Sequence, residues 1–65
     1  MRLNVNGRPL EVRADTLARL LNELGYGDQK VGTALNREFV RDKDRDATQL
    51  QEGDAVEIVT PRQGG

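Results

Sequence analysis

Apolar and polar residues alternate over the first thirteen positions of the chain, and Asn6-Gly7 interrupts the pattern midway. Side chains of a strand point to opposite faces in turn, so the alternation predicts two short strands that each bury one face. Asn and Gly tolerate the positive φ angles that a two-residue type I′ turn requires, and Pro9 suits an edge strand because it has no N–H to donate. The sequence therefore predicts an opening β-hairpin with these residues facing inward: Leu3, Val5, Leu10 and Val12.

The apolar period then changes to that of a helix. Four leucines recur at spacings of three and four residues, which places them on one helical face: Leu17, Leu20, Leu21 and Leu24. Asp15 or Thr16 can cap the start by accepting a free backbone N–H. Gly25 can end the helix in a left-handed conformation with Tyr26 folded back, as in a Schellman motif. We expect one amphipathic helix from about Thr16 to Leu24.

Strand patterns resume after the helix. A third strand is expected over residues 31–35, with Val31 and Leu35 facing inward, and a short fourth strand over residues 38–40. A turn at Asn36-Arg37 joins the two. Phe39 and Val40 are adjacent, so a regular strand cannot bury both side chains. We expect one of these two residues to face outward as a contact residue.

The segment from Arg41 to Asp46 alternates in charge and has no apolar period. We interpret it as a solvated loop rather than as a charge-rich site. Beyond it, Leu50 anchors the chain before a turn at Glu52-Gly53-Asp54. The pattern of residues 55–60 predicts the last strand, with these residues on its inner face: Val56 and Ile58.

The order of these elements predicts an α+β fold. The last strand is too distant in sequence to form a hairpin with the first, so we expect the two to pair in parallel in the middle of a mixed β-sheet. One helix packed across such a sheet is the β-grasp arrangement. We expect residues 1–60 to form this domain and residues 61–65, which end in Gly-Gly, to be a flexible tail.

Composition limits the chemistry that side chains can perform. The 65 residues contain no Cys and no His, which argues against disulfides, thiolate chemistry and the usual zinc ligands. A net charge of −1 and only two aromatic residues argue against direct binding of nucleic acid. The sequence has no nucleophile–base pair typical of an enzyme, and no apolar run typical of a signal peptide or membrane span. We therefore expect a cytoplasmic protein that is not an enzyme and binds no metal.

Several short motifs together carry a family resemblance along the whole chain. They are Leu3-Asn4-Val5-Asn6-Gly7, Leu17-Ala18-Arg19-Leu20-Leu21, Ala34-Leu35-Asn36, Glu52-Gly53-Asp54, Val56-Glu57-Ile58-Val59 and Gly64-Gly65. In this order and at this length, the chain resembles the ubiquitin-like β-grasp sulfur carriers, and within them the ThiS family of thiamine thiazole synthesis. The resemblance implies a carrier without a cofactor, which acts as a co-substrate of other enzymes.

The resemblance also implies chemistry at the C-terminus. An adenylyltransferase related to ubiquitin-activating enzymes (ThiF-like) would join AMP from ATP to Gly65, and a sulfur donor would convert the product to a thiocarboxylate. A thiazole synthase (ThiG-like) would then receive the sulfur. The chemistry is reasonable in itself, because a carboxylate is a poor electrophile until its oxygen belongs to a good leaving group such as AMP.

Five residues are candidates for this function. Gly65 is the expected modified residue, and Gly64 would let the tail thread a narrow enzyme channel because glycine has no Cβ. Val59, Phe39 and Arg62 are candidate partner contacts. Each has an ordinary interpretation as well, since single exposed apolar residues are common, glycine-rich chain ends are often merely flexible, and Arg62 can serve solubility alone.

The same fold and glycine end also suit other functions. A sulfur carrier for molybdopterin synthesis or tRNA thiolation, and a ubiquitin-like modifier that forms isopeptide bonds with lysines, use the same activation. A β-grasp interaction module would keep its partners after removal of Gly65, whereas a carrier or modifier would lose its activity. The sequence leaves the pathway, the partner enzymes and the oligomeric state open.

Overall fold

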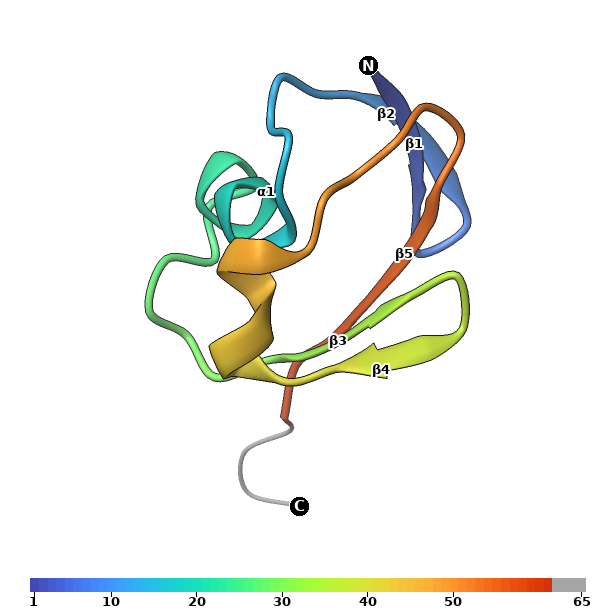
Figure 1. Cartoon of the computed structure of the whole chain (residues 1–65). Helices are drawn as coiled ribbons and strands as arrows, with labels where there is room; N and C mark the ends of the chain where they lie inside the picture. The colour runs from blue at the N-terminus through green and yellow to red at the C-terminus, as the bar shows by residue number, and fades with distance from the viewer. Residues whose placement is uncertain (62–65) are drawn as a thin grey trace.

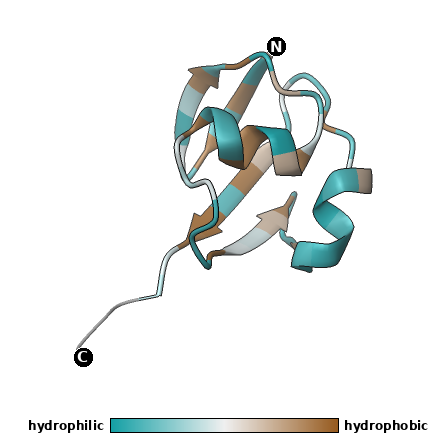
Figure 2. Cartoon of the chain, turned by 90° about the vertical axis from the view of Figure 1, so that its left-hand side faces the viewer, coloured by the Kyte–Doolittle hydropathy of each residue, from teal (hydrophilic) through white to brown (hydrophobic). Residues whose placement is uncertain are grey.

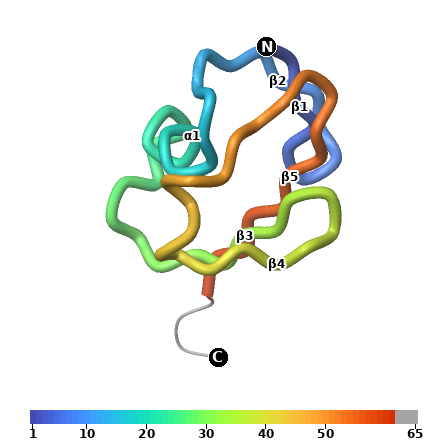
Figure 3. The backbone as a smooth tube through the Cα atoms, viewed as in Figure 1, coloured from blue at the N-terminus to red at the C-terminus, as the bar shows by residue number. Residues whose placement is uncertain are grey.

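The computed structural model describes residues 1–61, which form a five-stranded mixed sheet, one α-helix and one short 3₁₀ helix (Figure 1). In chain order the elements are β1 (Arg2–Val5), β2 (Arg8–Glu11), α1 (Leu17–Glu23), β3 (Gly32–Leu35), β4 (Glu38–Val40), the 3₁₀ helix η1 (Asp42–Ala47) and β5 (Ala55–Val59). Helix α1 covers one face of the sheet, and η1 lies between α1 and the β3–β4 hairpin (Figures 1 and 3). The predicted α+β arrangement is confirmed.

Strand β5 lies at the centre of the sheet, whose order is β2-β1-β5-β3-β4. It runs parallel to β1, where Val56 is opposite Val5, and antiparallel to β3, where Ile58 is opposite Thr33. The antiparallel hairpins β1–β2 and β3–β4 supply the outer strands. The predicted parallel pairing of the first and last strands is thus confirmed, and Pro9 lies on an edge strand as expected.

Two-residue turns join the strands of both hairpins. Asn6 and Gly7 have φ angles of 52° and 83°, and Asn36 and Arg37 have φ angles of 49° and 73°. Positive φ at both central residues is the property of a type I′ turn, whose twist matches that of the flanking strands. Both predicted turns are therefore present.

Helix α1 begins and ends through the predicted caps. Oγ1 of Thr16 accepts the Arg19 N–H at 3.2 Å. At the other end Gly25 has a φ of 89°, and the N–H groups of Gly25 and Tyr26 donate to carbonyl oxygens of the last turn at 3.1 and 2.9 Å. These two bonds make the Schellman pattern. The helix is one residue shorter at each end than expected because Thr16 and Leu24 are its caps.

The core lies between α1 and the inner face of the sheet. Ten apolar residues are buried there: Leu3, Val5, Val12, Ala14, Leu17, Leu20, Leu21, Leu50, Val56 and Ile58. Four residues that the sequence assigns to the core are only partly buried against this cluster: Leu10, Leu24, Val31 and Leu35. Leu24 is less covered than predicted because it is the C-cap, past the last full turn of α1.

The charged segment after β4 is the 3₁₀ helix η1, so the prediction of a loop there is wrong. Its surface is solvated as expected, and Figure 2 shows η1 as almost entirely hydrophilic. Only Arg45 among its residues is partly buried. A 3₁₀ helix has three residues per turn, so its sequence does not show the apolar period of 3.6 that identifies an α-helix. The search for that period therefore could not detect η1.

Residues 1–61 contain no helix that is long and apolar enough to cross a membrane. The expected domain boundary is next to Pro61, the last described residue. Most of the predicted flexible tail, residues 61–65, thus lies outside the described residues, and its flexibility stays a prediction.

Candidate functional site

The candidate site is the C-terminal end of the chain, to which β5 leads. β5 ends at Val59, and the described chain stops at Pro61. Gly64, Gly65 and Arg62 lie outside the described residues, so their expected functions stay predictions. The four residues that follow Pro61 can span at most about 14 Å when fully extended. The carboxylate of Gly65 is therefore tied closely to the folded part of the chain.

The last residues of β5 are held from both sides. On one side, Gly32 of β3 is opposite Val59. On the other side β1 has already ended, and the side chain of Asn6 takes its place. The Ile58 N–H donates to Oδ1 of Asn6 at 2.9 Å, and Nδ2 of Asn6 donates to the Ile58 carbonyl oxygen at 3.2 Å. The central strand is thereby hydrogen-bonded on its β1 side as far as Ile58.

Asn36 makes a related contact at the start of β5. Its Oδ1 accepts the Ala55 N–H at 2.9 Å, and its Nδ2 donates to Oδ1 of Asp54 at 3.1 Å. The sequence predicts Asn6 and Asn36 only as turn residues, because a side-chain bond to a strand distant in sequence depends on the tertiary arrangement. Both turns have Asn at their first position, and this repetition is the one sequence signal that could have indicated the side-chain bonds to β5.

Phe39 and Val59 lie on the face of the sheet opposite α1. Their side chains are 72% and 65% exposed, and they are the exposed large apolar residues of the described chain. Ala34 is opposite Phe39 in the β3–β4 hairpin and lies between them. We call Ala34, Phe39 and Val59 the outer patch, and together with Glu57 they line a shallow hollow of about 240 Å³. Val59 faces outward as the alternation predicts, while partner contact by Phe39 and Val59 stays a prediction.

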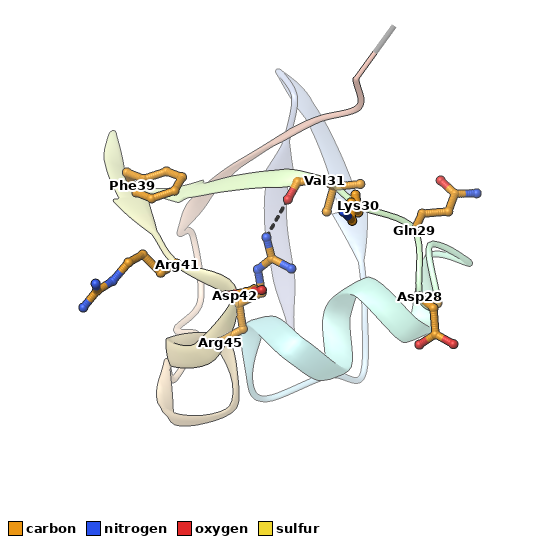
Figure 4. A pocket seen from close by; sticks show the side chains of 9 residues that line it. Asp28, Gln29, Lys30, Val31, Phe39, Arg41, Asp42 and Arg45 are labelled. Atoms are coloured by element: carbon orange, nitrogen blue, oxygen red, sulfur yellow. Dashed lines mark hydrogen bonds between the residues drawn. The ribbon is translucent and has the colours of Figure 1, made fainter. Parts of the chain in front are cut away.

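A second and broader hollow of about 750 Å³ borders Phe39 on the side of η1 (Figure 4). Its charged lining residues are Asp28, Lys30, Arg41, Asp42 and Arg45. Arg45 is used within the fold, since its Nη2 donates to the Val31 carbonyl oxygen at 2.6 Å, and Nε of Arg41 lies 3.5 Å from Oδ2 of Asp44. The mixed charge therefore favours no particular ligand. Among residues 1–61, no three acidic side chains gather as a metal site would require.

Comparison with known proteins identifies the family. Residues 3–65 match the model of the ThiS family. Sulfur carrier protein ThiS of Thermus thermophilus is 34% identical over 61 residues, which cover 94% of this chain and 95% of that protein. The crystal structure of thiamine biosynthesis protein ThiS from Geobacter metallireducens has 36% identity and a TM-score of 0.83, with all of both chains covered. A solution structure from the same organism has 35% identity and a TM-score of 0.81, and the match covers 100% of this chain and 88% of that one. The chain therefore belongs to the ThiS family.

Proposed function

We propose that this chain is a sulfur carrier of thiamine biosynthesis and carries the sulfur as a thiocarboxylate on Gly65. The observation that supports this most directly is the extent of the family match, which runs from residue 3 to residue 65 and so includes Gly64-Gly65. The relatives named above are a sulfur carrier and thiamine biosynthesis proteins. Thiamine is therefore preferred over molybdopterin or tRNA as the pathway served.

The proposed chemistry has two steps. An oxygen of the Gly65 carboxylate attacks the α-phosphorus of ATP and pyrophosphate leaves, which gives an acyl-adenylate. The sulfur of sulfide then attacks the carbonyl carbon, the C–S bond forms, and the bond to the AMP oxygen breaks. With sulfide as the donor, the products are the thiocarboxylate and AMP, so no oxidant or reductant is needed. Activation by AMP supplies the leaving group that a carboxylate lacks.

The chain acts in this scheme as a co-substrate, and the catalysts are its partners. We propose a ThiF-like adenylyltransferase as the activating partner and a ThiG-like thiazole synthase as the recipient. The outer patch is the candidate contact surface, because its large apolar side chains are exposed beside the strand that leads to the tail. Exposed apolar groups of this kind commonly mark a protein interface.

Mass spectrometry of the intact protein tests the proposal. With ATP, a ThiF-like adenylyltransferase and sulfide, the chain should first gain an AMP adduct and then the mass difference between sulfur and oxygen, located at Gly65. Gly65→Ala should slow the reaction, because the enzyme channel must accommodate a methyl group, and deletion of Gly65 should abolish it. Far-UV circular dichroism of both variants should match that of the wild type.

Complementation assigns the pathway. The wild-type gene should restore growth without thiamine to a strain that lacks its own thiazole sulfur carrier, and the variant without Gly65 should not. Rescue of a molybdoenzyme-deficient or tRNA-thiolation-deficient strain in place of this one would reassign the pathway. A wild-type chain that stays unmodified with several adenylyltransferases, or that carries sulfur elsewhere, would contradict the carrier function itself.

A further inference from the structure

We infer that Asn6 is a positioning residue for the C-terminal carboxylate, because its side chain replaces a missing strand beside the last part of β5. The inference rests on the proposed function, since it concerns how Gly65 is presented to an activating enzyme. It adds a function for a residue in the opening hairpin, which lies 59 positions before Gly65 in the sequence.

The geometry at the end of β1 supports this inference. β1 pairs with β5 through Val5 opposite Val56, and the backbone N–H of Asn6 still donates to the Val56 carbonyl oxygen at 2.9 Å. The chain then turns away at Asn6, whose φ is 52°. The next pair of backbone groups on that side of β5 belongs to Ile58, and the Asn6 amide satisfies both, at 2.9 and 3.2 Å. The Asn6 side chain thus continues the hydrogen bonding along β5 beyond the point where the main chain of β1 ends.

An amide is the group suited to this contact. Ile58 presents one donor and one acceptor, and the side chain of Asn offers one acceptor and a donor group at a short, fixed reach. Asp has the same shape, but as a carboxylate it only accepts, so it would place a negative charge beside the Ile58 carbonyl oxygen. Asn also tolerates the positive φ that the turn requires. Gly can keep the turn while it removes both side-chain bonds.

The place of the contact makes it relevant to chemistry at the terminus. Ile58 is three residues before Pro61 and seven before Gly65, so the tail starts directly after this end of β5. The contact holds the point from which the tail starts, so a shift at Ile58 changes how far the tail must reach when an enzyme binds the folded part of the chain. Acyl transfer depends on the alignment of the reacting atoms, and a misplacement of roughly 1 Å can reduce the rate about 100-fold.

Asn36 provides the matched control. It occupies the same position of a type I′ turn, has a φ of 49°, and also bonds the backbone of β5 through its side chain. Its contact is with Ala55, at the opposite end of the strand from the tail. Each Gly variant removes two side-chain hydrogen bonds and keeps its turn. Asn6→Gly loses both bonds to Ile58, whereas Asn36→Gly loses one bond to Ala55 and one to the Asp54 side chain. Only Asn6→Gly affects the end of β5 that leads to Gly65.

Two measurements on the full chain test the inference. The first is amide hydrogen exchange by NMR, in which Asn6→Gly should reduce the protection of the Ile58 N–H by about tenfold or more and Asn36→Gly should do so at Ala55. The second is the steady-state rate of adenylation by a ThiF-like enzyme at varied carrier concentration. Asn6→Gly should lower kcat about tenfold or more, with KM for the carrier within about twofold, because the contact surface is unchanged. Asn36→Gly should leave kcat within about twofold of the wild type.

The conservative variant Asn6→Asp separates alignment from simple loss of stability. It keeps the acceptor for the Ile58 N–H but loses the donor and places a carboxylate beside the Ile58 carbonyl oxygen, so its kcat should also fall below that of the wild type. If Asn6→Gly does not fold, Asn6→Asp is used in its place for both measurements. A wild-type kcat in Asn6→Gly, an equal loss in Asn36→Gly, or a rise in KM alone would overturn the inference. A wild-type carrier that is never adenylated would instead overturn the proposed function, while hydrogen exchange would still report whether Asn6 holds Ile58.

Discussion

At the scale of single residues, two asparagines connect the hairpin turns to the central strand. Asn6 and Asn36 both adopt positive φ and both bond the backbone of β5 through their side chains. Gly would serve the turns equally well, since it adopts positive φ freely, but it could not make these contacts. The use of Asn at both positions thus has a tertiary reason in addition to its local one.

We expect the largest loss of stability from a single substitution in the core. Leu20 is fully buried between α1 and the sheet, at 0% exposure. Leu20→Ala should lower the free energy of unfolding by about 2 to 5 kcal/mol, because it removes buried methyl groups and leaves a cavity. Urea unfolding followed by circular dichroism measures the change. Asn22→Ala, on the exposed side of the same helix, should change it by less than about 0.5 kcal/mol, and equal losses would contradict the packing of α1.

The positions of the core leucines could be predicted from sequence, whereas the hydrogen-bond partners of the buried Thr33 could not. Leu17, Leu20 and Leu21 follow the helical period and are buried as predicted. Thr33 is only 2% exposed, and its hydroxyl donates to the Val40 carbonyl oxygen at 2.8 Å. Its place between Val31 and Leu35 puts it on the inner face of a regular strand. The fold alone specifies its two partners, which are the Val40 carbonyl oxygen of β4 and Nε of Arg45 on η1.

At the scale of elements, η1 shows how one residue can dock a charged segment on the fold. Arg45 points from η1 toward the start of β3 in Figure 4 and donates to the Thr33 hydroxyl in this strand and to the carbonyl oxygen of Val31 just before it. The chain after η1 is tied to the start of α1, because the Leu17 N–H donates to the Thr48 carbonyl oxygen at 3.0 Å. Alternating charge correctly predicted the exposed surface of this segment. It could not predict which of several similar charges turns inward, because that depends on β3.

Removal of the Arg45 guanidinium should destabilise the fold. Arg45→Met keeps an apolar stem but removes the donors to the Thr33 hydroxyl and the Val31 carbonyl oxygen, which are 3.0 and 2.6 Å away. We expect the free energy of unfolding to fall by about 1 to 3 kcal/mol, because partly buried acceptors lose their partners. Arg41→Met is the matched control, since its ion pair with Asp44 is exposed and worth about 1 kcal/mol or less. Equal effects in urea unfolding would show that Arg45 has no special part in docking η1.

At the scale of the whole molecule, the proposed contact surface and the start of the tail lie at different parts of one sheet. One face of the sheet packs against α1, the opposite face carries the outer patch, and the end of β5 leads to the tail. The element order and the central place of β5 could be predicted because hydrophobic period and sequence separation determine them. Phe39 and Val59 could each be predicted as outward candidates, but their meeting in one patch could not. They are 20 positions apart and come together only through the pairing of β3 with both β4 and β5.

The outer patch should govern affinity for the activating enzyme rather than the rate of the chemical step. Phe39→Thr removes the most exposed aromatic side chain and keeps a residue that suits a strand, so the fold should persist. If Phe39 is an anchor of the interface, KM for the carrier in the adenylation assay should rise about tenfold or more, with kcat nearly unchanged. Asn4→Thr places the same residue on the same face but outside the patch and should leave both constants near their wild-type values. An unchanged KM in Phe39→Thr would exclude Phe39 as an anchor, whereas a fall in kcat alone would mean that the patch acts on alignment, the part that we assign to Asn6.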